Sequence, residues 1–245
     1  MSPAPEFLFP DWRLPPSVRA AMTTRMAGVS TGPYASLNLA MHVGDDPAAV
    51  AENRRRVRDA LELPAEPRWL TQVHGTTVAV LGSNEPGSAD AAVAFEARQV
   101  CAVLLADCLP ILLAGRDGDR VGIAHAGWRG LAAGVIEATV AALATDPADL
   151  AAWLGPAIGP AAFAVGAEVR EALLSSQPDA AGAFSPVDRG RFLADLPALA
   201  RGRLAACGIG RVHGGGQCTY SDPLRFYSYR RDGRTGRMAA LLWLA

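Results

Sequence analysis

The sequence predicts a single domain of mixed α+β structure, and three observations support this expectation. The chain has 245 residues, half of them apolar, and is long enough to bury a substantial core. Apolar runs typical of strands and segments with one apolar helical face occur along the same chain. No internal repeat, linker or low-complexity segment divides the sequence, so we expect residues 1–245 to form one domain.

Loops and extended segments dominate the first part of the chain. Residues 1–16 are rich in proline, which predicts an extended arm, and residues 23–44 have the Gly, Ser, Thr and Asn content of loops between short strands. Asp46-Pro47 is typical of a helix N-cap and first helical position, so we expect a helix from there to about Leu63. Strands are then expected at 69–73 and 77–81, with His74-Gly75 between them and a turn-rich loop at 84–90.

The middle of the chain contains a predicted hairpin. Ile111–Ala114 and Val121–Ala124 are apolar strand candidates on either side of Asp117-Gly118, a dipeptide that favours hairpin turns. Beyond the hairpin we expect helices at about 131–144, 167–175 and 192–207, strands within 153–165 and near 209–213, and a last hairpin at Asp232-Gly233.

Composition and charge argue against several classes of protein. The formal net charge of −1 argues against a nucleic-acid scaffold or a polybasic membrane binder. The N-terminal segment has prolines where a signal peptide needs an unbroken apolar stretch. The longest apolar stretches are interrupted by Asp107 and Glu137 and are too short to span a membrane. We therefore expect a soluble, cytoplasmic protein with small-molecule partners and neither nucleic acid nor membrane; the oligomeric state is left open.

The predicted hairpin brings a thiol and an imidazole together. If its strands pair symmetrically about Asp117-Gly118, Pro110 lies opposite His125 and Cys108 lies opposite Gly127. Cys108 then shares a face with His125 as a diagonal pair, with Cα atoms about 7–8 Å apart. Two side chains that each bind zinc at about 2.0–2.3 Å can close that gap. We expect this pair just beyond the end of the hairpin ladder.

A second histidine completes a candidate metal site. His74 lies between two predicted strands, next to a glycine that allows close backbone approach. With Cys108 and His125 it forms a Cys-His-His set, which leaves the fourth position of a zinc ion open for water, as in catalytic zinc sites. The two other histidines, His42 and His213, lie in Gly-rich loops and are expected to take no part.

The remaining cysteines point to no second site. The four cysteines of the chain include no CxxC pair, and a large cytosolic protein rarely needs disulfides. Cys101 lies in the strand before Cys108, on its opposite face, and Cys207 ends an Ala-rich helix, so both are expected in the core. Cys218 follows a Gly-rich loop, and nothing in the sequence pairs with it.

Several arginines are candidates for binding a ligand. Gly127-Trp128-Arg129-Gly130 leads into the helix predicted from Leu131, where Arg129 and a helix N-terminus suit an anion; an ordinary turn with a solvated arginine is the alternative. Arg25 and Asn38 lie in polar loops and are candidates for orienting a ligand. A basic cluster near the end of the chain is expected in a solvated hairpin, or to supply one phosphate contact: Arg225, Arg230, Arg231, Arg234 and Arg237.

A series of motifs runs in order from about Thr23 to Leu244. They are TTRxxGVSxGPYxSLNL, HVGDD, TQVHG, ADCLPILL, HAGWRG, GPAIGP and CTYSDP, followed by FYSYRRDGRTGRMAALLWL. Together they resemble the laccase-domain family, described variously as polyphenol oxidase, purine nucleoside phosphorylase and peptidoglycan editing factor. The spacing of ADC and HAGWRG is the most specific feature. One departure is GRVHGGGQCT, whose glycine-rich approach to the CT pair puts any contribution of His213 in doubt.

This resemblance implies both a fold and an activity. The fold would be a four-layer α/β/β/α sandwich, and His74, Cys108 and His125 would bind zinc. The activity would be phosphorolysis of purine nucleosides, together with adenosine deaminase and S-methyl-5′-thioadenosine phosphorylase activities. The usual zinc-deaminase signature H-x-E…P-C-x-x-C is absent, so deamination would need a different arrangement.

Three functions remain open for the Cys-His-His set. In a zinc enzyme, the metal lowers the pKa of bound water or polarises the substrate, Arg129 holds phosphate and Asp107 carries a proton. In a cysteine hydrolase that edits peptidoglycan precursors, Cys108 is the nucleophile and His125 its base. The third function is a non-catalytic metal-binding module.

The number of histidines argues against a laccase. A blue-copper centre alone uses two histidines and a cysteine, and a multicopper oxidase needs a further His-rich cluster. The four histidines of this chain cannot build both. Copper could still replace zinc in the same three-ligand site.

Overall fold

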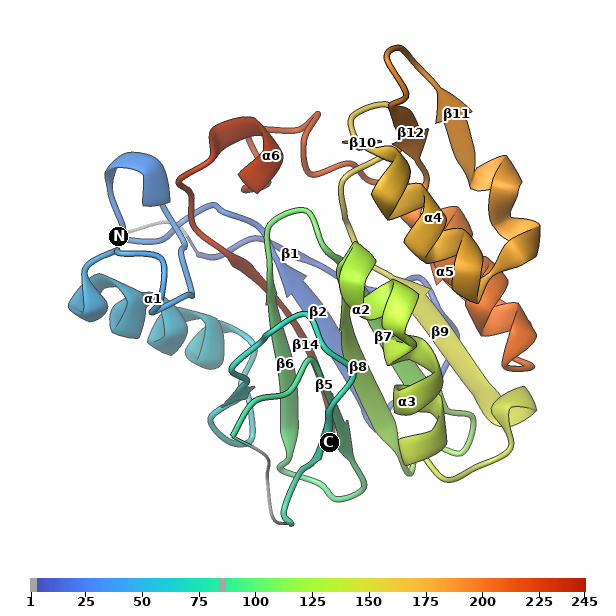
Figure 1. Cartoon of the computed structure of the whole chain (residues 1–245). Helices are drawn as coiled ribbons and strands as arrows, with labels where there is room; N and C mark the ends of the chain where they lie inside the picture. The colour runs from blue at the N-terminus through green and yellow to red at the C-terminus, as the bar shows by residue number, and fades with distance from the viewer. Residues whose placement is uncertain (1–3, 84–86) are drawn as a thin grey trace.

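The computed structural model describes residues 4–83 and 87–245, and its longer strands form two sheets that pack face to face (Figure 1). The first sheet has the order β1 (Phe7–Leu8), β2 (Val18–Thr23), β14 (Met238–Leu244), β6 (Val100–Leu105) and β3 (Arg68–Trp69). The second has the order β13 (Arg211–Gly214), β9 (Leu150–Leu154), β7 (Leu109–Gly115), β8 (Val121–Ala126), β5 (Ala91–Ala94) and β4 (Val78–Val80).

Helices cover the outer faces of both sheets (Figure 1). The first sheet is covered by α1 (Pro47–Ala60). The second is covered by α2 (Trp128–Ala133), α3 (Val135–Ala142), α4 (Ala167–Ser176) and α5 (Leu196–Ala206). A small sheet of β10 (Ala164–Val165), β12 (Phe192–Ala194) and β11 (Phe184–Pro186) lies beside α4, and a short helix, α6 (Tyr229–Asp232), lies above the sheets. This is the four-layer α/β/β/α arrangement that the resemblance implied.

The alternation of side chains explains why the inner strands are apolar throughout. On β6, Cys101, Val103 and Leu105 face the second sheet, whereas Ala102 and Leu104 face the α1 layer. Strands covered on both faces in this way read as continuous apolar runs rather than alternating ones. The expectation that Cys101 lies in the core is therefore confirmed.

The register of the central hairpin is confirmed. Pro110 pairs with His125 and Leu109 with Ala126, in the antiparallel pairing of β7 and β8. The turn uses Gly118 at φ +70°, a conformation that glycine adopts without steric cost. Cys108 therefore lies just before the first ladder residue, as expected.

Two predicted helices have different limits. The helix expected at 131–144 begins at Trp128 and is divided at Gly134, whose φ of +99° ends α2 and precedes α3. The helix expected from residue 192 begins at Leu196, because Asp195 caps it and accepts a hydrogen bond from the backbone of Ala198. The preceding residues pair as β12 instead.

The predicted last hairpin at Asp232-Gly233 is wrong. Ser228 caps the short helix α6, and Gly233 at φ +65° ends it. The chain then enters β14, which lies between β2 and β6 rather than beside an adjacent segment. Strands β3 and β4 are also shorter than the predicted 69–73 and 77–81, and residues 84–86 of the predicted loop lie outside the described part of the chain.

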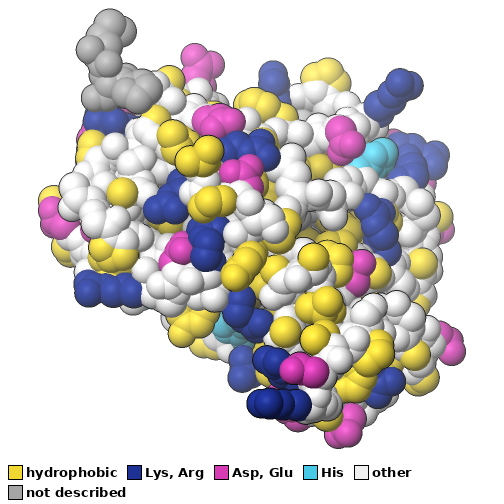
Figure 2. Space-filling model, turned by 90° about the horizontal axis from the view of Figure 1, so that it is seen from above, with side chains coloured by type: hydrophobic (Ala, Val, Ile, Leu, Met, Phe, Trp, Pro, Cys, Tyr) yellow, Lys and Arg dark blue, Asp and Glu magenta, His cyan; other side chains and the backbone are white. Residues whose placement is uncertain are grey.

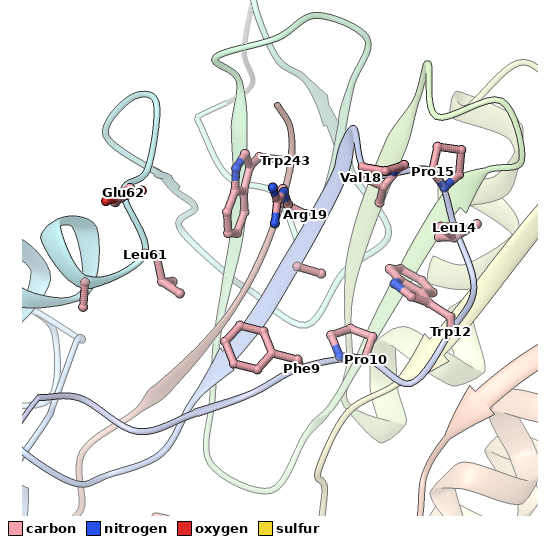
Figure 3. Close-up of a pocket in the computed structure, with 13 residues that line it drawn as sticks. Phe9, Pro10, Trp12, Leu14, Pro15, Val18, Arg19, Leu61, Glu62 and Trp243 are labelled. Carbon is pink, nitrogen blue, oxygen red and sulfur yellow. The ribbon is translucent and has the colours of Figure 1, made fainter.

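The proline-rich arm runs across the first sheet and encloses a groove (Figure 3). Its β1 adds a short strand to β2, and residues 9–15 belong to no helix or strand. The groove measures about 380 Å³ and is lined by the aromatic rings of Phe9, Trp12 and Trp243, together with prolines and aliphatic side chains. No helix in the described residues is both long and apolar enough to cross a membrane.

Candidate active site

Three elements bring the predicted ligands together at one end of the second sheet. His74 comes from the loop between β3 and β4, Cys108 directly precedes β7, and His125 lies on β8. Their nearest nitrogen and sulfur atoms all lie within 4.8 Å of one another. The His74 and His125 rings meet edge to face with centroids 4.8 Å apart, and the Cys108 Sγ lies 3.8 Å from the His74 Nε2.

The donor set fits a metal ion. Tetrahedral coordination with nitrogen at about 2.1 Å and sulfur at about 2.3 Å separates the two ligand atoms by about 3.6 Å. The observed 3.8 Å between sulfur and nitrogen is close to that value. His125 is buried, Cys108 is partly buried and His74 is exposed, so the group opens on one side toward solvent. A thiolate and two imidazoles are ligands that suit zinc or copper.

Asp90 organises both histidines and was not singled out from the sequence. Its side chain is fully buried, and its Oδ1 lies 2.9 Å from the Nδ1 of His125 and accepts a hydrogen bond from the backbone of His74. Its Oδ2 accepts from the backbones of Val73 and Gly75. Engagement of Nδ1 leaves the Nε2 of His125 for a metal or a proton. The one feature of the sequence that pointed to Asp90 was its place as an acidic residue directly before the fully apolar segment that forms β5.

Gly127 leaves the space in which His74 and Cys108 meet. A Cβ atom at this position would lie 2.8 Å from the Cδ2 of His74 and 3.0 Å from the Cys108 Sγ. Both distances are shorter than van der Waals contact between such atoms. The glycine opposite Cys108 is therefore required by the site itself, and not by the conformation of the turn.

Electrostatics favour the charged forms of Cys108 and His125. Burial alone would raise the pKa of the Cys108 thiol, but the charge of His125 and hydrogen bonds from His125 and His74 lower this pKa to about 6. Burial alone would lower the pKa of His125, but Cys108 and Asp90 raise it to about 9. The two groups therefore favour a thiolate beside an imidazolium. The thiolate is the form of cysteine that binds metals and attacks carbon.

The three candidate ligands line a cavity of about 500 Å³. Its other described lining residues include two arginines but no Asp or Glu: His42, Gln72, Leu104, Leu105, Ala106, Trp128, Arg129, Tyr229 and Arg237. Figure 2 shows the face above the sheets, where arginine side chains are prominent and histidine reaches the surface among them. The ionisable side chains of the cavity lining thus favour anionic ligands.

Arg129 reaches the cavity, but not in the predicted manner. It lies inside the first turn of α2, which begins at Trp128 and has only six residues. Its guanidinium lies over the Trp128 ring, 4.4 Å from the centroid. Since α2 is short, Arg129 supplies its own charge with little help from the helix dipole. His42, which was expected to take no part, also lines the cavity, whereas His213 lies on β13 and does not.

Asp107 is held away from the cavity by hydrogen bonds. Its carboxylate accepts from the hydroxyls of Thr219 and Ser228 and from the backbone N–H of Arg230. It is buried and is not among the residues that line the cavity. Both oxygens thus accept hydrogen bonds that link three segments of the fold, and proton transfer by Asp107 stays a prediction.

Arg25 and Asn38 also serve the fold. Arg25 donates to the backbone carbonyls of Ala35 and Pro223, and its guanidinium lies over the Tyr227 ring. Asn38 is fully buried, and its amide bridges neighbouring loop segments. Neither residue lines the cavity, and their role in orienting a ligand stays a prediction.

Comparisons with known proteins find similar sequences and a similar structure. The family model of multi-copper polyphenol oxidoreductase laccase matches residues 19–245. A purine nucleoside phosphorylase of Pseudomonas aeruginosa is 54% identical, over 97% of this chain and 98% of that protein. The purine nucleoside phosphorylase YfiH of Escherichia coli is 50% identical, over 98% and 99%. The crystal structure of Neisseria meningitidis protein NMB0706 superimposes with a TM-score of 0.92 at 49% identity, covering 97% of this chain and 98% of that one.

Proposed function

The chain belongs to the multi-copper polyphenol oxidoreductase laccase family, and from this premise we propose that it is a zinc-dependent purine nucleoside phosphorylase. We extend the proposal to deamination of adenosine and phosphorolysis of S-methyl-5′-thioadenosine. The observation that carries it is a Cys-His-His group opening into a cavity whose charged lining is basic. Relatives that share about half of the sequence bear the name purine nucleoside phosphorylase.

Phosphorolysis needs two substrates held side by side. An oxygen of phosphate forms a bond to C1′ of the ribose as the glycosidic C–N bond breaks, and the base leaves with the electron pair and gains a proton. His74, Cys108 and His125 would hold zinc, which would supply Lewis-acid polarisation or an activated water. Arg129 would attract the phosphate, and Asp90 would keep the His125 ring in position.

The proposal is tested by metal analysis and product analysis of the same preparation. We expect close to one zinc per chain, and release of free base and ribose 1-phosphate from inosine or adenosine only when phosphate is present. Inosine formed from adenosine without phosphate would mark the deaminase activity. A metal-loaded protein that leaves all of these nucleosides intact would contradict the proposal.

A cysteine hydrolase is the second candidate, and Asp90 is the observation that favours it. Cys108, His125 and Asp90 lie in the order of a nucleophile, a base and an orienting carboxylate. The sequence had revealed no such third group. A hydrolase would form a covalent adduct on Cys108 and would work without metal, whereas the zinc enzyme would lose activity on chelation and regain it with zinc. A metal-binding module would show zinc and neither activity.

The laccase activity in the family's name is not supported by this chain. Among the described residues, His74, Cys108 and His125 are the group of three potential ligands that converge. A multicopper oxidase needs a second, histidine-rich cluster. Copper could occupy the same three-ligand site in place of zinc.

A further inference from the structure

The side chain of Arg237 reaches the cavity from just before β14. The backbone N–H of Arg237 donates to the side chain of Asn38, which fixes the chain at this point. Its Nη1 donates to the carbonyls of Thr235 and Gly236 at 2.9 and 3.0 Å. The guanidinium is thus anchored by one nitrogen, and the residue lines the cavity together with Cys108.

The other edge of this guanidinium, formed by Nε and Nη2, has no hydrogen-bond acceptor among the described residues. Two partly buried arginines show the contrast. Arg25 directs the same two nitrogens to the carbonyl of Ala35, and Arg54 directs them to the carbonyl of Leu39. The Arg237 nitrogens are not among the buried side-chain atoms that lack a partner, so this edge is open to solvent and free to pair with a ligand.

Within the part of the chain that the structure describes, no carboxylate forms an ion pair or a hydrogen bond with the Arg237 side chain. Burial lowers the pKa of Arg237, while the charges of Cys108 and Asp107 favour its charged form. The Asp107 oxygens already accept hydrogen bonds from the hydroxyls of Thr219 and Ser228 and from the backbone N–H of Arg230. Cys108 belongs to the candidate metal group. Arg237 therefore lines a cavity whose described lining includes no Asp or Glu that could pair with its remaining N–H groups.

We propose that the Nε–Nη2 edge of Arg237 is the phosphate subsite of the cavity. Two parallel N–H groups on a rigid plane match two oxygens of a phosphate, a geometry that Lys cannot reproduce. Arg237 lines the same cavity as Cys108, and Arg129 supplies a second positive charge there. The inference rests on the proposed function in one respect: phosphorolysis requires the anion to be free phosphate, and not the phosphate group of a nucleotide.

The first measurement is calorimetric titration of inorganic phosphate, and separately of AMP, into the full-length, metal-loaded protein. For Arg237→Ala we expect phosphate affinity to fall by about tenfold or more, with Arg237→Lys between the two. The matched control is Arg234→Ala. Arg234 belongs to the same basic tail, but it is exposed, bonds to Tyr34 and does not line the cavity, so its loss should leave phosphate affinity unchanged.

The second measurement is the kinetics of phosphorolysis. Arg237→Ala should raise the KM for phosphate while leaving the KM for the nucleoside and any phosphate-independent deamination close to wild type. Unchanged phosphate binding and phosphate KM in this variant would overturn the inference, as would a dependence on Arg237 for AMP but not for phosphate. Phosphate binding that depends on Arg237 in a protein without phosphorolysis would uphold the subsite and reject the proposed function.

Folding of the variants is checked separately. Arg237→Ala removes the donor to the Thr235 and Gly236 carbonyls and will lower the thermal unfolding temperature. Arg237→Lys keeps one donor and the charge. If the alanine variant does not fold, phosphate affinity in the lysine variant decides: a loss supports the forked contact, and wild-type affinity contradicts it.

Discussion

Two thiols of this chain look alike electrostatically and differ in their surroundings. Cys108 and Cys218 are both partly buried, and in both burial would raise the thiol pKa while the neighbours lower it. At Cys108 the neighbours are two imidazoles. At Cys218 they are the Ser221 hydroxyl, which donates to the sulfur at 3.3 Å, and the backbone N–H of Gly159, which donates at 3.1 Å.

The difference shows that a lowered thiol pKa alone does not identify a site. Imidazoles can bind a metal or exchange a proton near neutral pH, whereas the backbone N–H and the hydroxyl at Cys218 donate hydrogen bonds that stabilise its negative charge. The Cys218 region therefore has the features of a structural turn. It pairs with Ala157 in an isolated bridge, and the next residue, Thr219, bonds to Asp107 beside Cys108.

Replacing each cysteine in turn should give the largest difference in zinc binding and activity between the two regions. Cys108→Ala should abolish zinc binding and lower phosphorolysis by about a thousandfold or more, since the thiolate supplies both charge and a soft donor. Cys218→Ala should keep the metal and the activity. Zinc content by mass spectrometry and turnover of inosine check both variants. Full zinc retention in Cys108→Ala would contradict the metal assignment.

The glycines that contact the two sulfurs offer a second test. Gly127→Ala places a Cβ 3.0 Å from the Cys108 Sγ, and Gly159→Ala places one 3.1 Å from the Cys218 Sγ. The steric demand is similar, but only the first displaces metal ligands. We expect Gly127→Ala to weaken zinc binding by about a hundredfold and Gly159→Ala to leave it unchanged. Chelator competition measures the affinities, and equal losses in the two variants would remove the distinction.

Replacing the buried Asp90 carboxylate, which contacts His74 and His125 beside Cys108, should lower zinc affinity by a smaller factor. Asp90→Asn replaces one carboxylate oxygen by an amide nitrogen, which cannot accept a hydrogen bond. The variant therefore loses the bonds either to the backbones of Val73 and Gly75 or to the backbone of His74 and the ring of His125. We expect zinc affinity to fall by about 10- to 100-fold, as for other carboxylates that orient a histidine ligand. Asp195→Asn, which alters the cap of the distant helix α5, is the control. Unchanged zinc affinity in Asp90→Asn at normal thermal stability would contradict this role.

Alkylation of the metal-free protein compares the two thiols directly. With a pKa of about 6, Cys108 should react with iodoacetamide at nearly its full rate at pH 7, and its rate should fall as the pH drops through 6. At pH 7 we expect its rate to exceed that of an unperturbed thiol by only about two- to fourfold, because the lower pKa raises the thiolate fraction but also reduces the intrinsic nucleophilicity of the sulfur. Peptide mapping after timed quenching gives both rates. A Cys108 alkylation rate that still rises severalfold between pH 7 and pH 9 would contradict the electrostatic description.

Two of the three candidate ligands could be brought together from the sequence because one local rule relates them, whereas His74 reaches them from the loop between β3 and β4. The Asp117-Gly118 turn sets the register of β7 and β8, and the register places Cys108 diagonally from His125. Asp90 and Arg237 could not be placed in the same way. Both reach the site through contacts between segments far apart in the chain, and neither carries a local spacing that would reveal them.

The incorrect elements of the prediction have local causes. Asp232-Gly233 is a strong hairpin signal, but the same glycine ends the helix that Ser228 begins. Gly134 divides the predicted helix because it adopts the left-handed conformation. In both places a glycine allowed two outcomes, and packing against distant strands selected one of them.

The inner position of β14 also sets the order in which the molecule can assemble. Its Ala240 pairs with Met22 of β2 on one side and with Val103 of β6 on the other. Neither neighbour can complete its hydrogen bonding until residues 238–244 have left the ribosome, so closure of this sheet is a late, long-range event. Until then the apolar strands remain open to aggregation and to chaperones. Arg237 and α6 directly precede β14 in the chain and are therefore synthesised just before it. A nascent chain whose first sheet is still open thus also lacks Arg237 at its cavity.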